Sequence, residues 1–313
     1  MPKMFTDAAQ TFEGRTMGTR WSVLIGGRVD DVGLHAKFQA VVDEVDAQMS
    51  TWKPDSNLMA LNAAPLDTWV SVPNRLLTVL ETGLAVSRQT AGAFEMNLGD
   101  AVRAWGFGPD SIDLGAIRAA SAARRVPAID ALELDKATRR ARKSAPLALD
   151  LSGIAKGYGV DCLAEIAIGL GLKHALCTID GEVRAIGTRQ DGSPWAVGID
   201  APDDGQRGNH SVIALQDTSV ATSGDYVHFV TVGAARLSHT IDPRRGAPLV
   251  DAPASVTVLS QSCMMADAMA TALTVMGKTA GPEFATAQGI SALFLLRESG
   301  AVKSVGTGAF ASS

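Results

Sequence analysis

The residues best suited to chemistry begin with the stretch 150–161, which reads DLSGIAKGYGVD. The apolar run 147–151 predicts a strand, the Ser-Gly pair predicts a turn, and apolar residues at helical spacing predict a helix from Ile154 onward. A helix that begins at such a turn presents unpaired backbone N–H groups and the positive end of its dipole, which together favour an anion. Lys156 lies in the first turn of this helix, so the stretch suits a phosphate-bearing ligand; a solvated lysine on an ordinary connection is the alternative.

A carboxylate and a hydroxyl four residues apart form a second candidate. Asp267 and Thr271 lie in the run ADAMATAL, residues 266–273, which predicts a helix. On a helix, side chains at this spacing share one face about one turn apart. Because the surrounding residues are small alanines, these oxygens leave room for a hard cation such as Mg²⁺, whose shell substrate phosphates can complete. The alternative is an aspartate near a helix start and a threonine packed in the core.

A histidine beside a turn is the third candidate. His239 lies in SHTIDPRRG, residues 238–246, just before a predicted strand residue, Ile241, and an Asp-Pro turn at Asp242. The pKa of an unperturbed histidine lies near neutrality, so His239 could act as a general base; a structural histidine is the alternative. In ATSGDYVHF, residues 221–229, a Ser-Gly turn before a predicted strand suits close approach of a ligand to the backbone.

The charge balance and the cysteines exclude several classes of function. The chain carries 28 basic and 33 acidic side chains, a formal net charge of −5. This balance argues against a general nucleic-acid binder, because such proteins depend on neutralising phosphates. Cys162, Cys177 and Cys263 match neither a disulfide framework nor a metal-binding spacing, so we expect small buried residues at these positions.

The length of 313 residues suits one large domain or two intertwined lobes. No run approaches the roughly 20 apolar residues that a membrane span requires. The first residues also lack the apolar core of a signal peptide and a lipobox-like cysteine. As written, the chain is therefore expected in the cytoplasm, and a trimmed N-terminus would instead leave a periplasmic location open.

The elements expected to position these candidates mix strands and helices. Alternating apolar residues at 12–25 predict a hairpin or bent strand, and Ser56 is the expected N-cap of a short helix. Gly277 is expected to end the last of three longer helices, which apolar spacing predicts at 32–49, 73–90 and 264–276. Further strands are expected at 175–179, 183–186, 195–199, 211–215, 227–232 and 255–259. Because strands and helices do not alternate strictly, the pattern favours an α+β fold.

The order and wording of these segments resemble the ApbE family, the FAD:protein FMN transferases, over nearly the whole chain. The matching segments are MGTRW, STWKPDSNLMALN, GAFEMN, WGFGP, DLSGIAKGYGVD, DGEVRAIG, ATSGDY, LSHTIDPRRG, SVTVLS and ADAMATAL. The resemblance implies one compact ApbE-like or T-fold-like α+β domain over residues 1–313, with an approximate core at 12–310. Mixed sheets flanked by helices would form two intertwined lobes, with FAD in the cleft between them.

The resemblance also implies roles for particular residues. FAD would be bound by Met17, Trp52, Ala93, Phe94, Glu95, Asp150, Lys156 and Ile241. Mg²⁺ would be held by the Gly153 carbonyl and by the side chains of Asp267 and Thr271. His239 would be the base, with Asp242 orienting it.

Three positions depart from the pattern of the family. Trp52 stands where a tyrosine is usual, and an indole ring can still stack on a flavin. Ala270 stands where some relatives have a second aspartate, which leaves one or two metal ions open. The segment 180–182 reads Asp-Gly-Glu where Gly-Gly-Glu is usual.

The reaction that the resemblance implies is transfer of FMN from FAD to a threonine hydroxyl of an acceptor protein, a flavin-dependent redox subunit, with release of AMP. It is a displacement at phosphorus, so positioning and charge neutralisation by Mg²⁺ and Lys156 would supply most of the catalysis. Two alternatives stay open. One is an FAD pyrophosphatase that uses water as the acceptor, and the other is a non-catalytic FAD-binding protein.

Overall fold

An eight-stranded sheet is the largest element of the computed structural model, which describes residues 9–27, 29, 32–202, 208–224, 229–232, 235–298 and 301–311. Neighbouring strands in this sheet pair antiparallel. In spatial order the strands are β1 (Gln10–Thr16), β2 (Thr19–Ile25), β6 (Ala175–Ile179), β7 (Glu182–Ile186), β10 (Ser219–Gly224), β15 (Ser255–Ser260), β16 (Ser291–Glu298) and β17 (Ala301–Thr307). The longest excursion from the sheet, between β2 and β6, carries most of the helices.

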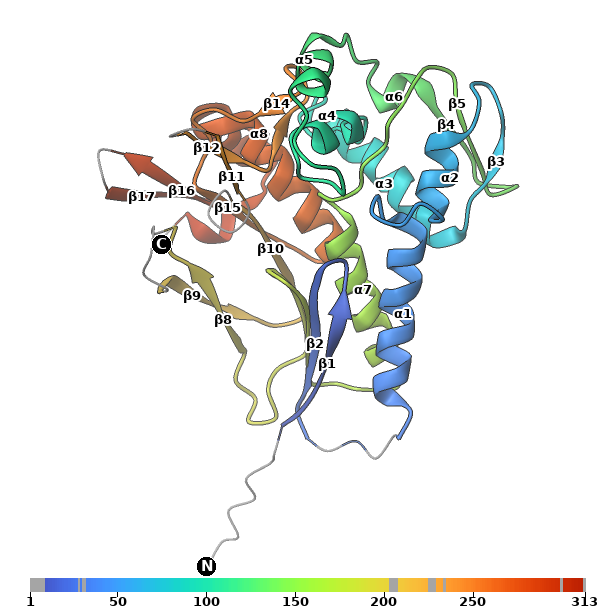
Figure 1. Ribbon diagram of the computed structural model, residues 1–313. Helices are drawn as coiled ribbons and strands as arrows, with labels where there is room; N and C mark the ends of the chain where they lie inside the picture. Colours follow the sequence, from blue (N-terminus) through green and yellow to red (C-terminus); the bar gives the residue numbers. More distant parts are fainter. Residues whose placement is uncertain are drawn as a thin grey trace, which may run out of the picture.

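Helices cover one face of this sheet and a hairpin covers the other (Figure 1). The helices are α1 (Leu34–Met49), α7 (Ala155–Gly169) and α8 (Cys263–Ala287), and the hairpin joins β8 (Trp195–Asp200) to β9 (Asn209–Leu215). Side chains of a strand alternate between the two faces of its sheet. In β16, Phe294 packs in the core beneath the helices, whereas Leu293 and Leu295 pack on the hairpin side. The main core therefore lies between the sheet and the three helices.

Further helices and short strands gather in the upper half of the molecule as drawn in Figure 1. The helices there are α2 (Asn57–Ala63), α3 (Asn74–Gln89), α4 (Gly99–Ala104), α5 (Leu114–Ala122) and α6 (Ala128–Ala131). The strands there are β3 (Val70–Ser71), β4 (Leu132–Asp135), β5 (Arg140–Lys143), β11 (Phe229–Val232), β12 (Ala235–Ser238), β13 (Ile241–Asp242) and β14 (Ala247–Pro248). Residues of α4, α5 and β13 form a small core of their own, which contains Leu98, Ala101, Ala104, Ala120 and Ile241.

Most of the predicted elements are confirmed, and with them the α+β class. The turn between β1 and β2 is Met17-Gly18, with φ angles of 47° and 73°; two positive angles match the twist of a tight hairpin. Ser56 accepts a hydrogen bond from the Met59 N–H at 3.1 Å and caps α2. The expected long helices appear as α1, α3 and α8. The expected strands appear as β6, β7, β8, β9 and β15, and the strand at 227–232 falls partly outside the described residues.

The predicted strand at 147–151 is wrong, because these described residues form no strand ladder. The side chain of Asn62 brackets Leu149: its amide donates to the Leu149 carbonyl at 2.9 Å and its oxygen accepts the Leu149 N–H at 2.8 Å. Asn97 accepts the Ala148 N–H at 2.7 Å, and the Asp150 N–H bonds to the Met96 carbonyl. Asparagine side chains and a loop thus supply the bonds that a neighbouring strand would otherwise make.

Two predicted turns have different outcomes. Gly277 interrupts α8 as expected, with φ 85° and ψ −170°, and a second helical segment then continues to Ala287. The Ser-Gly turn expected in 221–229 is wrong in part, because Ser223 and Gly224 extend β10 and pair with β15. The remainder of that turn, residues 225–228, lies outside the described residues.

Three further expectations concern the whole chain. All three cysteines are buried, and none of them is in a disulfide in the described structure, as expected. None of the described helices combines the length and the apolarity that crossing a bilayer needs. The expected limits of the core, residues 12 and 310, fall within β1 and within a final 3₁₀ turn, Gly308–Phe310.

Candidate active site where two helices cross

The turn before α7 is fixed from both sides. Leu151 and Ile154 are buried and anchor the turn in the core. The Asp150 carboxylate accepts the Ser152 N–H at 2.8 Å, the local bond by which an aspartate stabilises a turn. The Ala155 N–H bonds back to the Leu151 carbonyl at 2.9 Å and begins the helix. The N-terminus of α7 and Lys156 in its first turn are therefore held where the sequence predicted them.

A glycine lets α7 touch α8. A Cβ atom added at Gly157 would lie 2.4 Å from the Cys263 carbonyl oxygen and 2.7 Å from Cβ of Asp267, closer than non-bonded atoms approach. The Gly157 N–H donates to Oδ2 of Asp267 at 2.9 Å. This bond corrects the expectation that the N–H groups at the start of α7 are unpaired, because the Asp267 carboxylate accepts one of them.

The three predicted metal-ligating residues meet at this crossing. A Cβ atom added at Gly153 would lie 3.0 Å from Oγ1 of Thr271 and 3.2 Å from its methyl carbon. Thr271 therefore points at the Gly153 turn. It lies one helical turn after Asp267, which itself bonds to α7. Phe94 borders the same space, with a ring carbon 3.5 Å from the added Cβ. The absence of a side chain at Gly153 leaves a small gap between the turn and α8.

Carboxylates outnumber ammonium groups around this gap. Nζ of Lys156 lies 3.0 Å from Oε1 of Glu182 and 3.2 Å from Oδ2 of Asp180. Burial raises the pKa of Glu182 to about 8, against the attraction of Lys156. Burial also raises the pKa of Asp267 to about 6. Burial alone would lower the pKa of Lys156, but Glu182, Asp267 and Asp180 outweigh it and raise that pKa. Three carboxylates thus share one ammonium group.

These residues fit a hard divalent cation. The described residues contain no group of three or more His, Cys, Asp or Glu side chains that could hold a metal ion. The predicted set does not need one, because it combines one carboxylate with a hydroxyl and a backbone carbonyl. Such an oxygen-only set is typical of Mg²⁺, which keeps waters and takes phosphate oxygens from its substrate. Burial disfavours the ionised forms of Asp267 and Glu182, and a cation bound beside them would favour those ionised forms again.

Glu182 is a candidate site residue that sequence reasoning missed. Its side chain is 2% exposed, and Oε2 has no hydrogen-bond partner among the described residues. Buried carboxylate oxygens are normally hydrogen-bonded, so an orphaned one beside a predicted cation site calls for an explanation. Its position as the first residue of β7, after the Asp180-Gly181 turn, was the available signal.

The predicted flavin residues are spread from the crossing to the surface. The Met17 methyl group lies 3.3 Å from a Cβ added at Gly159, so Met17 reaches α7 from the first hairpin. Phe94 is buried and Ala93 is half-buried in the main core. Trp52 is 62% exposed, an unusual exposure for an indole ring and one that permits stacking on a ligand.

Other predicted FAD contacts also have structural tasks. Oε1 of Glu95 accepts the N–H groups of Asn97 at 2.7 Å and Ala128 at 3.0 Å, and burial raises the pKa of Glu95. Ile241 is 4% exposed in the small core of α4 and α5. Oδ2 of Asp150 is buried without a partner among the described residues, and burial raises the pKa of Asp150. Contact of these three with FAD stays a prediction.

The predicted base, His239, comes from a different segment of the chain than the helix crossing and has an aromatic neighbour. His239 is half-buried, and its ring meets the edge of the Phe107 ring with centroids 6.4 Å apart. Oδ1 of Asp242 accepts the Arg244 N–H at 2.9 Å and so shapes its own Asp-Pro turn. The orienting role of Asp242 toward His239 stays a prediction.

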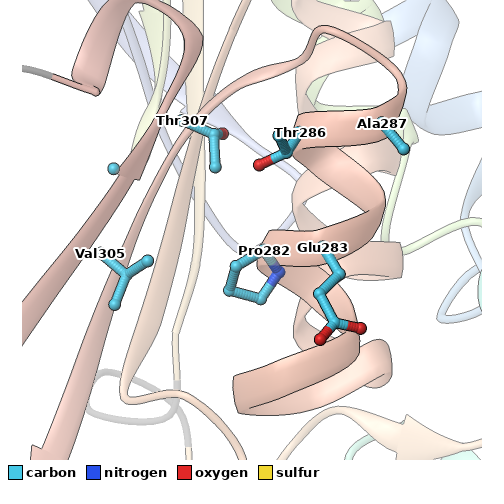
Figure 2. A pocket seen from close by; sticks show the side chains of 7 residues that line it. Pro282, Glu283, Thr286, Ala287, Val305 and Thr307 are labelled. Carbon is cyan, nitrogen blue, oxygen red and sulfur yellow. The ribbon is translucent and has the colours of Figure 1, made fainter.

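Two surface hollows lie elsewhere. One, of about 460 Å³, lies between the second segment of α8 and β17; Figure 2 shows Pro282 and Thr286 facing Val305 and Thr307. The other, of about 480 Å³, is lined by residues that include Arg75, Arg139 and Tyr158. Of the described residues that line either hollow, none is a predicted site residue.

Comparison with known proteins decides the family. The model of the ApbE family matches residues 17–294. The chain belongs to the ApbE family. The ApbE match starts at Met17 and ends at Phe294, so it contains every site residue that the resemblance indicated.

Curated and solved ApbE relatives agree along almost the whole chain. The FAD:protein FMN transferase of Vibrio cholerae is 34% identical, and the alignment covers 95% of this chain and 90% of that protein. The protein of the same name from Escherichia coli K12 is 30% identical over 93% of this chain and 85% of its own. The crystal structure of the Pseudomonas stutzeri flavinyl transferase ApbE, apo form, superposes with a TM-score of 0.86 at 32% identity and covers 100% of both chains. The ApbE fold is therefore shared in full.

Proposed function

We propose that this chain is an Mg²⁺-dependent FAD:protein FMN transferase, which moves FMN from FAD to a threonine hydroxyl of an acceptor protein and releases AMP. The observation that carries the proposal is the meeting of Gly153, Asp267 and Thr271 beside Lys156. Relatives that carry the name FAD:protein FMN transferase align with nearly the whole chain.

The helix crossing provides the groups that a diphosphate requires. Gly153, Asp267 and Thr271 would hold Mg²⁺, which supplies neutralisation of the charge on phosphate oxygens. Lys156 adds a positive charge next to the same gap; an ammonium group has three N–H donors, and its bonds to Asp180 and Glu182 use two of them. The N-terminus of α7 adds its dipole. Positioning and charge neutralisation are the main demands of phosphoryl transfer.

The chemical step is a displacement at the phosphorus atom of the FMN half. The threonine hydroxyl oxygen of the acceptor attacks, the phosphorus–oxygen bond to AMP breaks, and AMP leaves with the electron pair. His239 takes the proton of the attacking hydroxyl as the general base, which is a role suited to a histidine near neutral pH. Trp52, whose indole ring is exposed, would stack on the isoalloxazine ring of FAD.

The test is to incubate the purified chain with FAD, Mg²⁺ and a candidate acceptor protein. We expect acceptor-bound flavin fluorescence that survives denaturing electrophoresis, a mass increase of the acceptor by one FMN, and an equal amount of AMP. The Asp267→Asn variant serves as the control for catalysis by a contaminant. Free FMN and AMP without labelled acceptor would instead identify an FAD pyrophosphatase. FAD binding without AMP release would identify a flavin-binding protein and overturn the proposal.

A further inference from the structure

Each of the two helices that form the site has its N-terminus capped by an aspartate of the other helix. Asp267 of α8 accepts the N–H of Gly157, the third residue of α7, at 2.9 Å. Asp161 of α7 accepts the N–H groups of Cys263 and Met264, the first two residues of α8, each at 3.0 Å. Asp161 lies one helical turn after Gly157, whose N–H group is capped by Asp267. Likewise, Asp267 lies one helical turn after Cys263, whose N–H group is capped by Asp161. The arrangement is reciprocal, and each carboxylate lies at the positive end of the other helix.

The two carboxylates differ in how completely the protein uses them. Both oxygens of Asp161 are occupied: Oδ1 also accepts from Arg184 at 2.6 Å, and Oδ2 also accepts from the Ser262 hydroxyl at 2.7 Å. Asp161 is thereby tied to β7 as well as to α8. For Asp267, by contrast, the hydrogen bond given by the structure involves Oδ2 alone. The bonds of Asp161 are those of a structural residue, whereas Oδ1 of Asp267 is left for a ligand.

Asp161 binds the first turn of the helix that carries the predicted cation ligands. At Gly157, α8 lies so close to α7 that any side chain would prevent the contact. One turn further along α7, Asp161 accepts hydrogen bonds from the first turn of α8. Asp267 and Thr271 follow on the next turns of α8, so a rotation or shift of its N-terminus moves both relative to the Gly153 turn. Residues that orient metal ligands without touching the metal typically change metal affinity 10- to 100-fold when they are replaced.

We propose that Asp161 is a positioning residue that, through this reciprocal capping, holds Asp267 and Thr271 against the Gly153 turn and so sets the affinity of the cation site. The inference rests on the proposed function for the existence of that site. It assigns Asp161 no contact with FAD, with the cation or with the acceptor.

The test measures binding of Mn²⁺ alone to the whole chain, through loss of the electron paramagnetic resonance signal of the free ion. For Asp161→Asn, which keeps the size of the side chain but loses its charge, we expect the Kd for Mn²⁺ to rise about tenfold or more. For Arg184→Gln, which leaves the carboxylate in place and removes one partner, we expect a rise of about threefold. Thermal unfolding, followed by circular dichroism, identifies the temperature at which each variant is folded.

Asp100→Asn is the matched control, because Asp100 also pairs with an arginine at 2.6 Å, Arg125, but outside the helix crossing. We expect its Kd for Mn²⁺ to stay within twofold of wild type. Unchanged Mn²⁺ affinity in folded Asp161→Asn, or an equal change in Asp100→Asn, would overturn the inference. If Asp161→Asn does not fold, Arg184→Gln decides in the same way. A wild-type chain that binds no Mn²⁺ would remove the cation site of the proposed function and this inference with it.

Discussion

The two halves of the candidate site are built differently. In the helix-crossing half, Gly157, Asp161 and Asp267 are interlocked by backbone contacts and buried hydrogen bonds, and carboxylates lie at both helix N-termini. In the loop half, Trp52 is 62% exposed and His239 is half-buried against the Phe107 ring. The first half belongs to the core, and the second belongs to surface connections.

The difference corresponds to what each half must do in the proposed reaction. A diphosphate and a divalent cation need charges at fixed places in low dielectric surroundings, which a buried helix crossing supplies. An acceptor protein needs access, which surface loops supply. Replacements in the helix-crossing half should therefore change cation binding or stability, and replacements in the loop half should change the rate while the fold stays intact.

The largest effect is expected from Asp267→Asn. The amide keeps an oxygen that can accept the Gly157 N–H, so the helix contact survives while the charge offered to the cation is lost. We expect metal-dependent AMP release to fall at least about a thousandfold, because the step depends on charge neutralisation. The measurement is initial rate against Mg²⁺ concentration, with circular dichroism to verify folding. A rate near wild type at the Mg²⁺ concentration that half-saturates the wild-type chain would show that Asp267 holds no catalytic cation.

His239→Ala probes the loop half. Removing a general base typically costs a factor of about 10² to 10⁴, so we expect kcat to fall in this range. FAD affinity, measured by quenching of flavin fluorescence, should stay within about twofold, because the base acts on the hydroxyl of the acceptor. Phe107→Leu, which removes the ring beside His239 and keeps the imidazole, is the comparison. A proportional loss of FAD affinity and rate in His239→Ala would contradict the assigned role.

The same division explains what the sequence could predict. Helical spacing predicted that Asp267 and Thr271 share a face, and the turn before Lys156 predicted the start of α7, because both depend on neighbours within a few residues. The strand at 147–151 was predicted wrongly because its true partners, Asn62 and Asn97, come from distant segments.

Long-range partners also hid two residues of the helix-crossing half. Asp161 reads as one more residue of an apolar helix until α8 is placed against it, 102 positions away in sequence from Cys263. For Glu182 the only local signal was its position directly after the Asp180-Gly181 turn. Its burial beside Lys156 comes from the pairing of β7 with β6 and β10. No local pattern contains that information.

Gly157→Ala tests the closeness of the helix-crossing half. The new methyl group would meet the Cys263 carbonyl oxygen at 2.4 Å, so α8 must shift. We expect a loss of about 1–3 kcal/mol in the free energy of unfolding and about tenfold weaker Mn²⁺ binding. Gly169→Ala, at the other end of α7, is the control, because no described atom lies within 4 Å of its added Cβ. There the substitution should be neutral or stabilising. Equal effects at the two glycines would contradict the packing account.

A further effect is expected in the pH dependence of stability of the metal-free protein, where the raised pKa of Glu182 should be visible. Burial raises its pKa from 4.5 to about 8 in the folded chain. Between these values the folded state binds more protons than the unfolded state, so the free energy of unfolding falls as pH rises, by at most about 1.4 kcal/mol per pH unit for one proton. Glu182→Gln removes this contribution, so its stability curve should be flatter between pH 5 and pH 8.

Denaturant midpoints measured with a chelator present, across pH 5 to 8, provide the comparison. Asp135→Asn is the control, because hydrogen bonds from Thr138 lower the pKa of Asp135 below its usual value and both states are then ionised over this range. Its curve should therefore run parallel to that of wild type. If the stability curve of Glu182→Gln also runs parallel to that of wild type, Glu182 does not carry the extra proton. The Glu182 carboxylate would then be ionised in the metal-free protein as well. Saturating Mn²⁺ should flatten the wild-type curve in the same sense, since a cation beside Asp267 and Glu182 favours their ionised forms.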